Sequence, residues 1–223
     1  MNAKTIRRLW KNLRFRGSAA YWERRYSRGR TSGSGSQDRL AEFKAEVLNR
    51  FVADNDIGSV IEFGCGDGNQ LALARYPRYT GLDVSRKAIE LCTERFASDP
   101  SKTFVHHVPD SFRHRDELSA DLALSLDVVY HLVEDDVFEK YMEHLFGAAR
   151  RYVVVYSSNH DEPSESRSAF GIHVRHRRFV DYVERNFASW RMVEEIPNRH
   201  PFDPEDPRPT SFANFYVFER IAE

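Results

Sequence analysis

Three glycines that follow a short apolar run constrain this chain more than any other feature. Gly64, Gly66 and Gly68 end the run Val60-Ile-Glu-Phe-Gly-Cys-Gly-Asp-Gly68. Glycine lets the backbone take positive φ angles and approach a ligand closely. The dinucleotide pattern G-x-G-x-x-G fails, because both positions at which its third glycine could fall hold other residues, and no Gly-Lys-Ser/Thr of a Walker loop occurs. The loop therefore indicates a small-molecule site other than a pyrophosphate site, and the alternative is that the glycines form only a tight turn.

Strand and helix patterns alternate from residue 58 onward, and this alternation predicts an α/β fold. Short apolar runs bounded by turn residues predict strands, and apolar residues at helical spacing predict helices. Such alternation implies a parallel sheet that is covered by helices on both faces. The predicted strands span residues 59–63, 79–83, 103–108, 120–126 and 152–157, and the predicted helices span 69–75, a segment capped by Ser85, and 135–148.

The C-terminal part follows a different pattern. A predicted helix at 176–187 precedes two strand-like runs, 190–196 and 211–220, which a proline-rich segment separates. That segment is too short for a crossover helix, so the two strands are predicted to be antiparallel neighbours. The complete prediction is a seven-stranded, mostly parallel sheet with an antiparallel final strand and helices on both faces.

The charge distribution separates the N-terminal residues from the rest of the chain. Residues 1–30 hold ten Lys or Arg and one acid, whereas the remaining 193 residues hold 23 bases and 33 acids. The apolar spacing in 4–15 fits either an amphipathic helix on a membrane or partner surface, or a basic helix that caps the domain. A second helix is predicted over 38–53. We therefore divide the chain into a helical lid or arm, 1–54, and one globular unit, 55–223.

Composition excludes several classes of protein. The 16 Phe, 10 Tyr and 3 Trp are too many for a disordered chain, and no run of about 18 apolar residues exists that could cross a membrane. Only two cysteines, Cys65 and Cys92, are present, which rules out a disulfide scaffold and fits a reducing compartment. A cytoplasmic protein is expected, and peripheral membrane contact through the basic arm is left open.

Two motifs resemble those of class I S-adenosylmethionine (SAM)-dependent methyltransferases. The run Glu62–Gly68 is similar to the first motif of that family, and Gly81-Leu-Asp-Val-Ser85 to the second. The resemblance covers roughly residues 55–160 and implies a Rossmann-like fold, SAM as cofactor, and a strand-end acid, Asp83, that accepts both ribose hydroxyls. It also implies an acid against the adenine amine, here Asp110; the alternatives are a helix cap for Asp83 and a plain loop for Asp110. The cofactor residues implied are Glu62, Phe63, Gly64, Cys65, Gly66, Gly68, Asp83, Val84, Asp110, Ser111, Leu126 and Asp127, joined by Tyr21 and Tyr26 from an N-terminal aromatic cluster.

The segment after the fourth predicted strand carries the candidate catalytic residues. Ligands of open α/β sheets bind at the carboxyl ends of the strands, where Asp127, Tyr130 and His131 fall. A hydroxyl acceptor must lose its proton as it attacks, so His131 is the candidate base, with Tyr130 as wall or hydrogen-bond partner. The alternative is that His131 is a structural residue with its hydrogen bonds satisfied. Asp127 either orients His131 or binds Mg²⁺, which prefers oxygen ligands. The acids Glu134–Asp136 are explained better by the dipole of the next helix than by a metal site.

Polar residues farther along the chain predict a wall for a hydroxylated or anionic acceptor, and the alternative is a solvated basic start of the late helix. The segment Leu126-Asp-Val-Val-Tyr-His-Leu132 resembles small bacterial methyltransferases, some of them linked to polysaccharide modification, which favours O-methylation of a sugar hydroxyl. The alternatives are another small-molecule acceptor, a nucleic acid or a non-catalytic SAM-binding module. The acidic body and the lack of an Asn/Asp-Pro-Pro-Tyr/Phe motif argue against nucleic acid, and a homodimer is left open. The expected substrate residues are Tyr130, His173, Arg175, His176 and His200.

Overall fold

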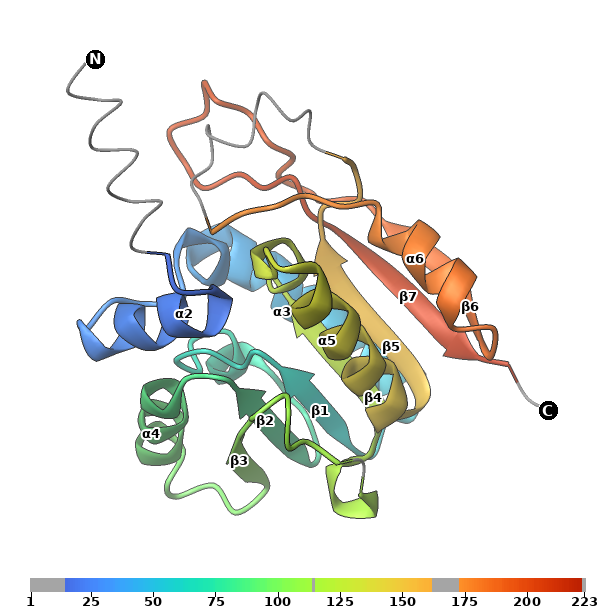
Figure 1. Cartoon of the computed structure of the whole chain (residues 1–223), viewed down its shortest axis with the longest axis horizontal. Coiled ribbons are helices and arrows are strands. Elements are labelled where there is room, and N and C mark those ends of the chain that lie inside the picture. Colours follow the sequence, from blue (N-terminus) through green and yellow to red (C-terminus); the bar gives the residue numbers. More distant parts are fainter. Residues whose placement is uncertain (1–14, 114, 162–172, 222–223) are drawn as a thin grey trace.

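The computed structural model describes residues 15–113, 115–161 and 173–221 (Figure 1). The predicted helix at 4–15 lies almost wholly outside the described residues. The helices are α2 (Ser18–Ser27), α3 (Asp38–Asp54), α4 (Arg86–Arg95), α5 (Asp135–Ala148) and α6 (Phe179–Asn186). The strands are β1 (Val60–Phe63), β2 (Tyr79–Asp83), β3 (Lys102–His106), β4 (Ala120–Leu126), β5 (Ala149–Ser157), β6 (Trp190–Ile196) and β7 (Asn214–Arg220). Short 3₁₀ turns are η1 (Ser34–Ser36), η2 (Leu71–Leu73), η3 (Asp116–Leu118) and η4 (Val129–His131).

Seven strands form one sheet in the order β3-β2-β1-β4-β5-β7-β6. β1 to β5 pair in parallel, and β7 is antiparallel to both of its neighbours, β5 and β6. Parallel neighbours need a crossover connection, whereas β6 and β7 are joined by the proline-rich loop as an antiparallel pair. The predicted Rossmann-like methyltransferase fold, with its antiparallel last strand, is confirmed.

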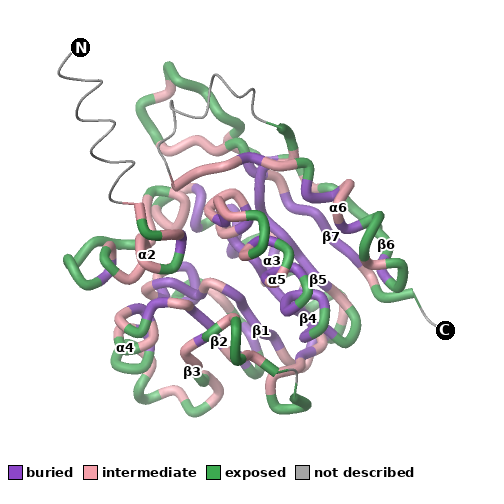
Figure 2. Tube along the Cα trace, in the orientation of Figure 1, coloured by how far each residue is buried: buried purple, intermediate pink, exposed green. Residues whose placement is uncertain are grey.

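Two apolar clusters cover the two faces of the sheet and bury it (Figure 2). One cluster joins the sheet to α5 and α6 through large residues such as Phe146 and Phe179. The other joins it to α3 and α4 through residues such as Phe43, Leu48 and Cys92. Helix α3 is therefore part of the core, although it belongs to the N-terminal division made above. That division at residue 54 stays a prediction.

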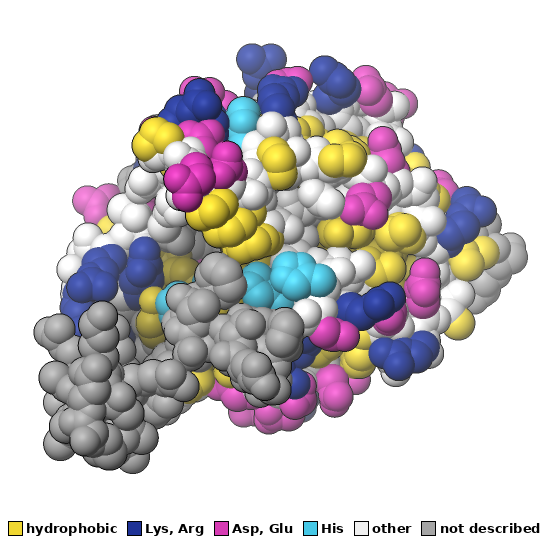
Figure 3. Space-filling model, turned by 90° about the horizontal axis from the view of Figure 1, so that it is seen from above, with side chains coloured by type: hydrophobic (Ala, Val, Ile, Leu, Met, Phe, Trp, Pro, Cys, Tyr) yellow, Lys and Arg dark blue, Asp and Glu magenta, His cyan; other side chains and the backbone are white. Residues whose placement is uncertain are grey.

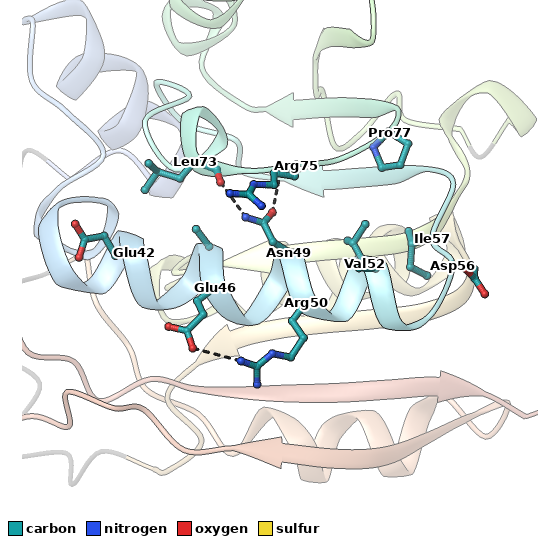
Figure 4. A pocket seen from close by; sticks show the side chains of 12 residues that line it. Glu42, Glu46, Asn49, Arg50, Val52, Asp56, Ile57, Leu73, Arg75 and Pro77 are labelled. Atoms are coloured by element: carbon teal, nitrogen blue, oxygen red, sulfur yellow. Dashed lines mark hydrogen bonds and ion pairs between the residues drawn. The ribbon is translucent and has the colours of Figure 1, made fainter.

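The predicted helix at 69–75 is wrong, because only the 3₁₀ turn η2 forms there. Pro77 disfavours a helical conformation in the residue before it. Asn49 on α3 also forms hydrogen bonds with the backbone of this segment. Its Nδ2 donates to Leu73 O at 3.0 Å, and its Oδ1 accepts from Arg75 N at 2.7 Å. A groove of about 820 Å³ runs between α3 and this short connection (Figure 4).

Two local signals at other helix ends are confirmed. Ser85 caps α4 as predicted, because its Oγ accepts a hydrogen bond from Ala88 N at 3.1 Å. Helix α5 has the predicted bounds, 135–148. Among the described residues, the helices are too short or too polar to span a lipid bilayer.

Candidate active site

A cavity of about 390 Å³ opens at the edge of the sheet where the parallel strands end. Histidine and hydrophobic side chains gather on the molecular face above these strand ends (Figure 3). The cavity walls come from α2, the glycine loop, the ends of β2 and β4, the segment after β3, and the start of α5. Of the predicted cofactor residues, those that line it are Tyr26, Glu62, Gly64, Cys65, Asp83, Val84, Asp110, Leu126 and Asp127.

Each glycine of the loop has a positive φ and a crowded position. A Cβ atom on Gly64 would lie 2.4 Å from Val128 Cγ2, and one on Gly66 would lie 2.3 Å from Ser32 Oγ. On Gly68 it would lie 2.7 Å from Phe96 Cε2. Gly64 lines the cavity, whereas Gly66 and Gly68 lie outside its lining and pack against Ser32 and Phe96.

Asp83 ends β2 with its carboxylate at the cavity. Its Oδ2 accepts from Gly66 N at 3.0 Å and its Oδ1 accepts from Ser85 N at 2.8 Å. Burial raises its pKa to about 6 despite these hydrogen bonds. A carboxylate has about four lone-pair sites, so two remain for ligand hydroxyls. The arrangement fits the ribose of SAM.

Glu62 and Gln70 are buried acceptors on the same cavity. Tyr79 Oη donates to Glu62 Oε2 at 2.6 Å, and burial raises the pKa of Glu62 to about 7. Gln70 Nε2 donates to Ala41 O at 3.1 Å, whereas its Oε1 has no hydrogen-bond partner among the described residues. An orphaned buried acceptor beside a cavity fits a ligand donor there. Gln70 was not predicted as a site residue, because no motif marks it.

Helix α2 covers the cavity, and hydrogen bonds hold the helix and the loop after it at three places. Ser18 donates from its N and Oγ to Glu134 at 2.9 and 2.6 Å. Ser85 Oγ donates to Glu23 at 2.7 Å. The loop after α2 is held by Asp67, which accepts from both N and Oγ of Ser32 at 2.9 Å. The carboxylate of Glu134 therefore serves the N-terminus of α2, a role that no sequence pattern indicated.

The N-terminal aromatic residues divide into two groups. Trp22 and Tyr26 line the cavity and stack at a centroid distance of 5.8 Å. Tyr21 does not line it, because its ring stacks on His173 at 4.4 Å. Trp22, in turn, meets the His131 ring edge-on at 4.9 Å.

His131 lines the cavity at the end of η4. Its Nδ1 lies 2.9 Å from His173 O, so Nδ1 carries the proton and Nε2 has the lone pair. Nε2 makes no hydrogen bond to the described part of the chain. Burial lowers the pKa of His131 to about 4, which keeps the ring neutral at physiological pH. The predicted base is thus in a state that can accept a proton.

Asp127 is held in a buried network that the sequence did not reveal. Lys44 on α3 is fully buried, and its Nζ lies 2.6 Å from Asp127 Oδ2. Tyr130 Oη donates to Asp127 Oδ1 at 2.8 Å. Asp127 also has φ +58°, a strained value for a residue other than glycine. Tyr130 therefore reaches Asp127 rather than the cavity.

The residues present do not fit Mg²⁺. An ammonium group already neutralises Asp127, the one predicted ligand. Within the described ranges, no group of three His, Cys, Asp or Glu side chains is placed to hold a metal ion.

The other predicted cofactor residues differ in their placement. Asp110 stands at the cavity mouth, where Lys140 Nζ lies 2.5 Å from its Oδ1. Phe63 is fully buried beneath the cavity, and its O accepts from Tyr141 Oη at 2.9 Å. Ser111 is exposed on the loop after β3 and lies outside the cavity lining.

The predicted substrate wall is only partly assembled around the cavity. His173 touches the ring of His131, with centroids 5.4 Å apart. Arg175 is paired with Asp135 at 2.9 Å. His176 lies 2.6 Å from Ser158 Oγ, and His200 lies against Phe43 on another side. None of these four lines the cavity.

His107 is a cavity residue that was not predicted from the sequence. It follows β3, is buried, and its Nε2 lies 3.1 Å from His144 Nδ1. Burial lowers its pKa to about 3. Its position in the strand pattern made it look like an ordinary strand residue.

Comparisons with known proteins agree with this geometry. Residues 60–151 match the family model described as a methyltransferase domain. The matched part includes the glycine loop, Asp83 and His131. No curated protein matches the chain.

Solved structures show the same fold at low identity. The N-methyltransferase NodS from Bradyrhizobium japonicum WM9, in complex with S-adenosyl-L-homocysteine (SAH), has a TM-score of 0.68 at 16% identity, covering 92% of this chain and 98% of its own. Magnesium protoporphyrin IX methyltransferase (ChlM) from Synechocystis PCC 6803 with bound SAM has a TM-score of 0.58 at 16% identity, covering 99% and 98%. The methyltransferase domain of bacterial CtHen1-C has 0.62 at 20%, covering 82% and 100%. These likenesses show a shared fold, and the matched structures include methyltransferases with bound SAM or SAH.

Proposed function

We propose that this chain is an O-methyltransferase that uses His131 as general base on a hydroxyl of an uncharged saccharide. The observation that carries the proposal is the state of His131. Its Nδ1 is bonded to His173 O at 2.9 Å, and its Nε2 is left as a proton acceptor beside the cavity. Hydroxyl acceptors require such a base, and an imidazole in this state supplies it.

The residues of the cavity have separate tasks in this reaction. Asp83 and the glycine loop would hold SAM, which would supply the methyl group. Trp22 and Tyr26 cover the site and exclude water. His131 Nε2 takes the acceptor proton, and the Nδ1–H bond to His173 O fixes the ring while it does so. Positioning of the two reactants accounts for much of the rate.

The charges near the site favour an uncharged acceptor. Three arginines near this edge are paired with acids: Arg175 and Arg177 with Asp135 at 2.9 Å, and Arg39 with Asp206 at 2.8 Å. A nucleic-acid site would need free cations along the phosphates. A saccharide needs mainly neutral donors, acceptors and aromatic rings. The likeness of Leu126–Leu132 to polysaccharide-linked methyltransferases supports the same class.

A second candidate is N-methylation of an amine. The N-methyltransferase NodS has the same fold over 92% of this chain. An amine that attacks the methyl group must also lose a proton, so His131 would act as general base for this acceptor too. The two candidates therefore differ in the acceptor atom.

A methyl-transfer assay with the purified protein separates these candidates. Radiolabelled SAM is supplied with neutral oligosaccharides, amino sugars or RNA, each with Mg²⁺ or with a chelator. The proposal predicts transfer to neutral oligosaccharides that is equal with and without Mg²⁺. Transfer only to amino sugars would replace it with the second candidate, and transfer only to RNA would contradict both.

His131→Gln tests the base assignment in the same assay. Loss of a general base lowers kcat by roughly 10²–10⁴-fold. SAH binding by calorimetry should stay unchanged, because His131 accepts the acceptor's proton and does not hold SAM. His200→Gln is the matched control, since His200 lies against Phe43, away from the cavity. A His131→Gln variant with wild-type kcat would remove His131 from catalysis.

A further inference from the structure

Gln70 presents an unused acceptor to the cofactor cavity. The residue is 8% exposed, and its side chain lines the cavity. Its Oε1 has no hydrogen-bond partner in the part of the chain that the structure describes. Leaving a buried acceptor unpaired is costly, so such an atom points to a donor that arrives with a ligand.

The orientation of the Gln70 amide is fixed by α3. Nε2 donates to Ala41 O at 3.1 Å. The reversed amide would place Oε1 against that carbonyl oxygen, and two acceptors repel each other. Oε1 is therefore the end of the amide that remains available for a ligand, and it can only accept a hydrogen bond.

Glu62 is an acidic side chain on the same cavity. Burial raises its pKa to about 7, and the charge of Lys44 lowers it only in part. Lys44 Nζ lies 2.6 Å from Asp127 Oδ2, so the charge of that carboxylate is already neutralised. Glu62 is therefore a buried acid on this lining whose charged form a cationic ligand group would favour.

We propose that Gln70 Oε1 accepts a hydrogen bond from the α-ammonium group of SAM and so recognises the amino-acid end of the cofactor. The inference rests on the proposed function only in that SAM occupies this cavity. A carboxylate cannot be the partner of Oε1, because neither group has a proton to donate. Of the donors on SAM, the ribose hydroxyls are assigned to Asp83 and the adenine amine to Asp110, which leaves the ammonium group for Gln70.

Calorimetric titration with matched ligands tests this inference. The ligands are SAH, the SAH analogue in which hydrogen replaces the α-amino group, and 5′-methylthioadenosine, which lacks the amino-acid end. Gln70→Met keeps the size of the side chain and removes the acceptor. It should weaken SAH binding at least about tenfold, because a hydrogen bond to a charged group is lost. The affinities for the deaminated analogue and for methylthioadenosine should stay within about twofold of wild type.

The matched control is Gln37→Met, since Gln37 reaches Thr31 on the surface and not the cavity. It should bind all three ligands as wild type does. If Gln70→Met weakens all three ligands equally, Gln70 supports the fold through Ala41 and the inference is wrong. If SAH binding is unchanged in Gln70→Met, water satisfies Oε1 and the inference is also wrong. If the wild type binds none of the three, the cofactor assignment fails together with the inference.

Discussion

Two parts of the site differ in how far apart in the sequence their hydrogen-bonded residues lie. One is the glycine-loop half, residues 62–85, and the other is the N-terminal segment, residues 15–54. In the glycine-loop half, Asp83 reaches Ser85 two residues away and Gly66 seventeen residues away. In the N-terminal segment, Ser18 reaches Glu134 across 116 positions, and Lys44 reaches Asp127 across 83. The hydrogen bonds of the glycine-loop half therefore join residues that are close in the sequence. Those of the N-terminal segment form only when distant parts of the chain have come together.

Lys44→Met should have the largest effect on stability among the variants that probe this difference. It leaves the partly buried Asp127 carboxylate without its partner, which costs about 3–5 kcal/mol of unfolding free energy. Urea unfolding followed by circular dichroism measures the loss. Arg50→Met is the matched control on the same helix, because Arg50 is exposed and 3.6 Å from Glu46. A loss below about 1 kcal/mol for Lys44→Met would show that α3 is not anchored through Asp127.

Asp67→Asn should have a smaller effect, which is confined to how firmly α2 and the Ser32 loop cover the cavity. The substitution removes the charge and one of the two acceptors that hold Ser32 N and Oγ. Loss of one such bond costs about 1–2 kcal/mol, so SAH should dissociate roughly 5–30-fold faster. Stopped-flow tryptophan fluorescence, to which the cavity residue Trp22 contributes, reports dissociation. Asp54→Asn at the exposed end of α3 is the control. Unchanged dissociation would separate the Ser32 loop from ligand release.

Glu62→Gln tests the glycine-loop half through pH. The pKa of Glu62 is raised from 4.5 to about 7 in the folded protein, mainly by burial. An unfolded chain releases this proton near 4.5, so the native state binds more protons between pH 4.5 and 7. The stability that the protonated Glu62 contributes is therefore complete below pH 4.5 and is lost as pH rises through 7.

Urea unfolding at a series of pH values checks this sign. The unfolding free energy of Glu62→Gln minus that of wild type should increase as pH rises from 4.5 to 7. A difference that stays constant over this range would show that Glu62 ionises normally in the fold. The amide oxygen that Glu62→Gln introduces can still accept from Tyr79 Oη, so the hydrogen bond itself is preserved.

The same contrast explains what the sequence could predict. The strands 79–83, 120–126 and 190–196 and the cap Ser85 were correct, because apolar runs and capping residues act over a few positions. The helix expected at 69–75 does not form, because the side chain of Asn49 on α3 makes hydrogen bonds with the backbone of Leu73 and Arg75.

Site residues follow the same rule. Asp83 and Gly64 were found through motifs, and the structure places both at the cavity. Lys44, Gln70 and His107 were missed, since each looks like an ordinary helix, turn or strand residue until the fold brings it to the site. Sequence position could not reveal that Arg175 is paired with Asp135.

A calorimetric titration of the protein with SAH tests most directly whether this cavity holds the cofactor. We expect one-to-one binding by wild type, affinity at least about tenfold weaker in Asp83→Asn, and unchanged affinity in His131→Gln. Asp83 would then hold the cofactor while His131 serves the acceptor. Absence of binding by wild type, or equal affinity in Asp83→Asn, would contradict the assignment of this cavity to SAM.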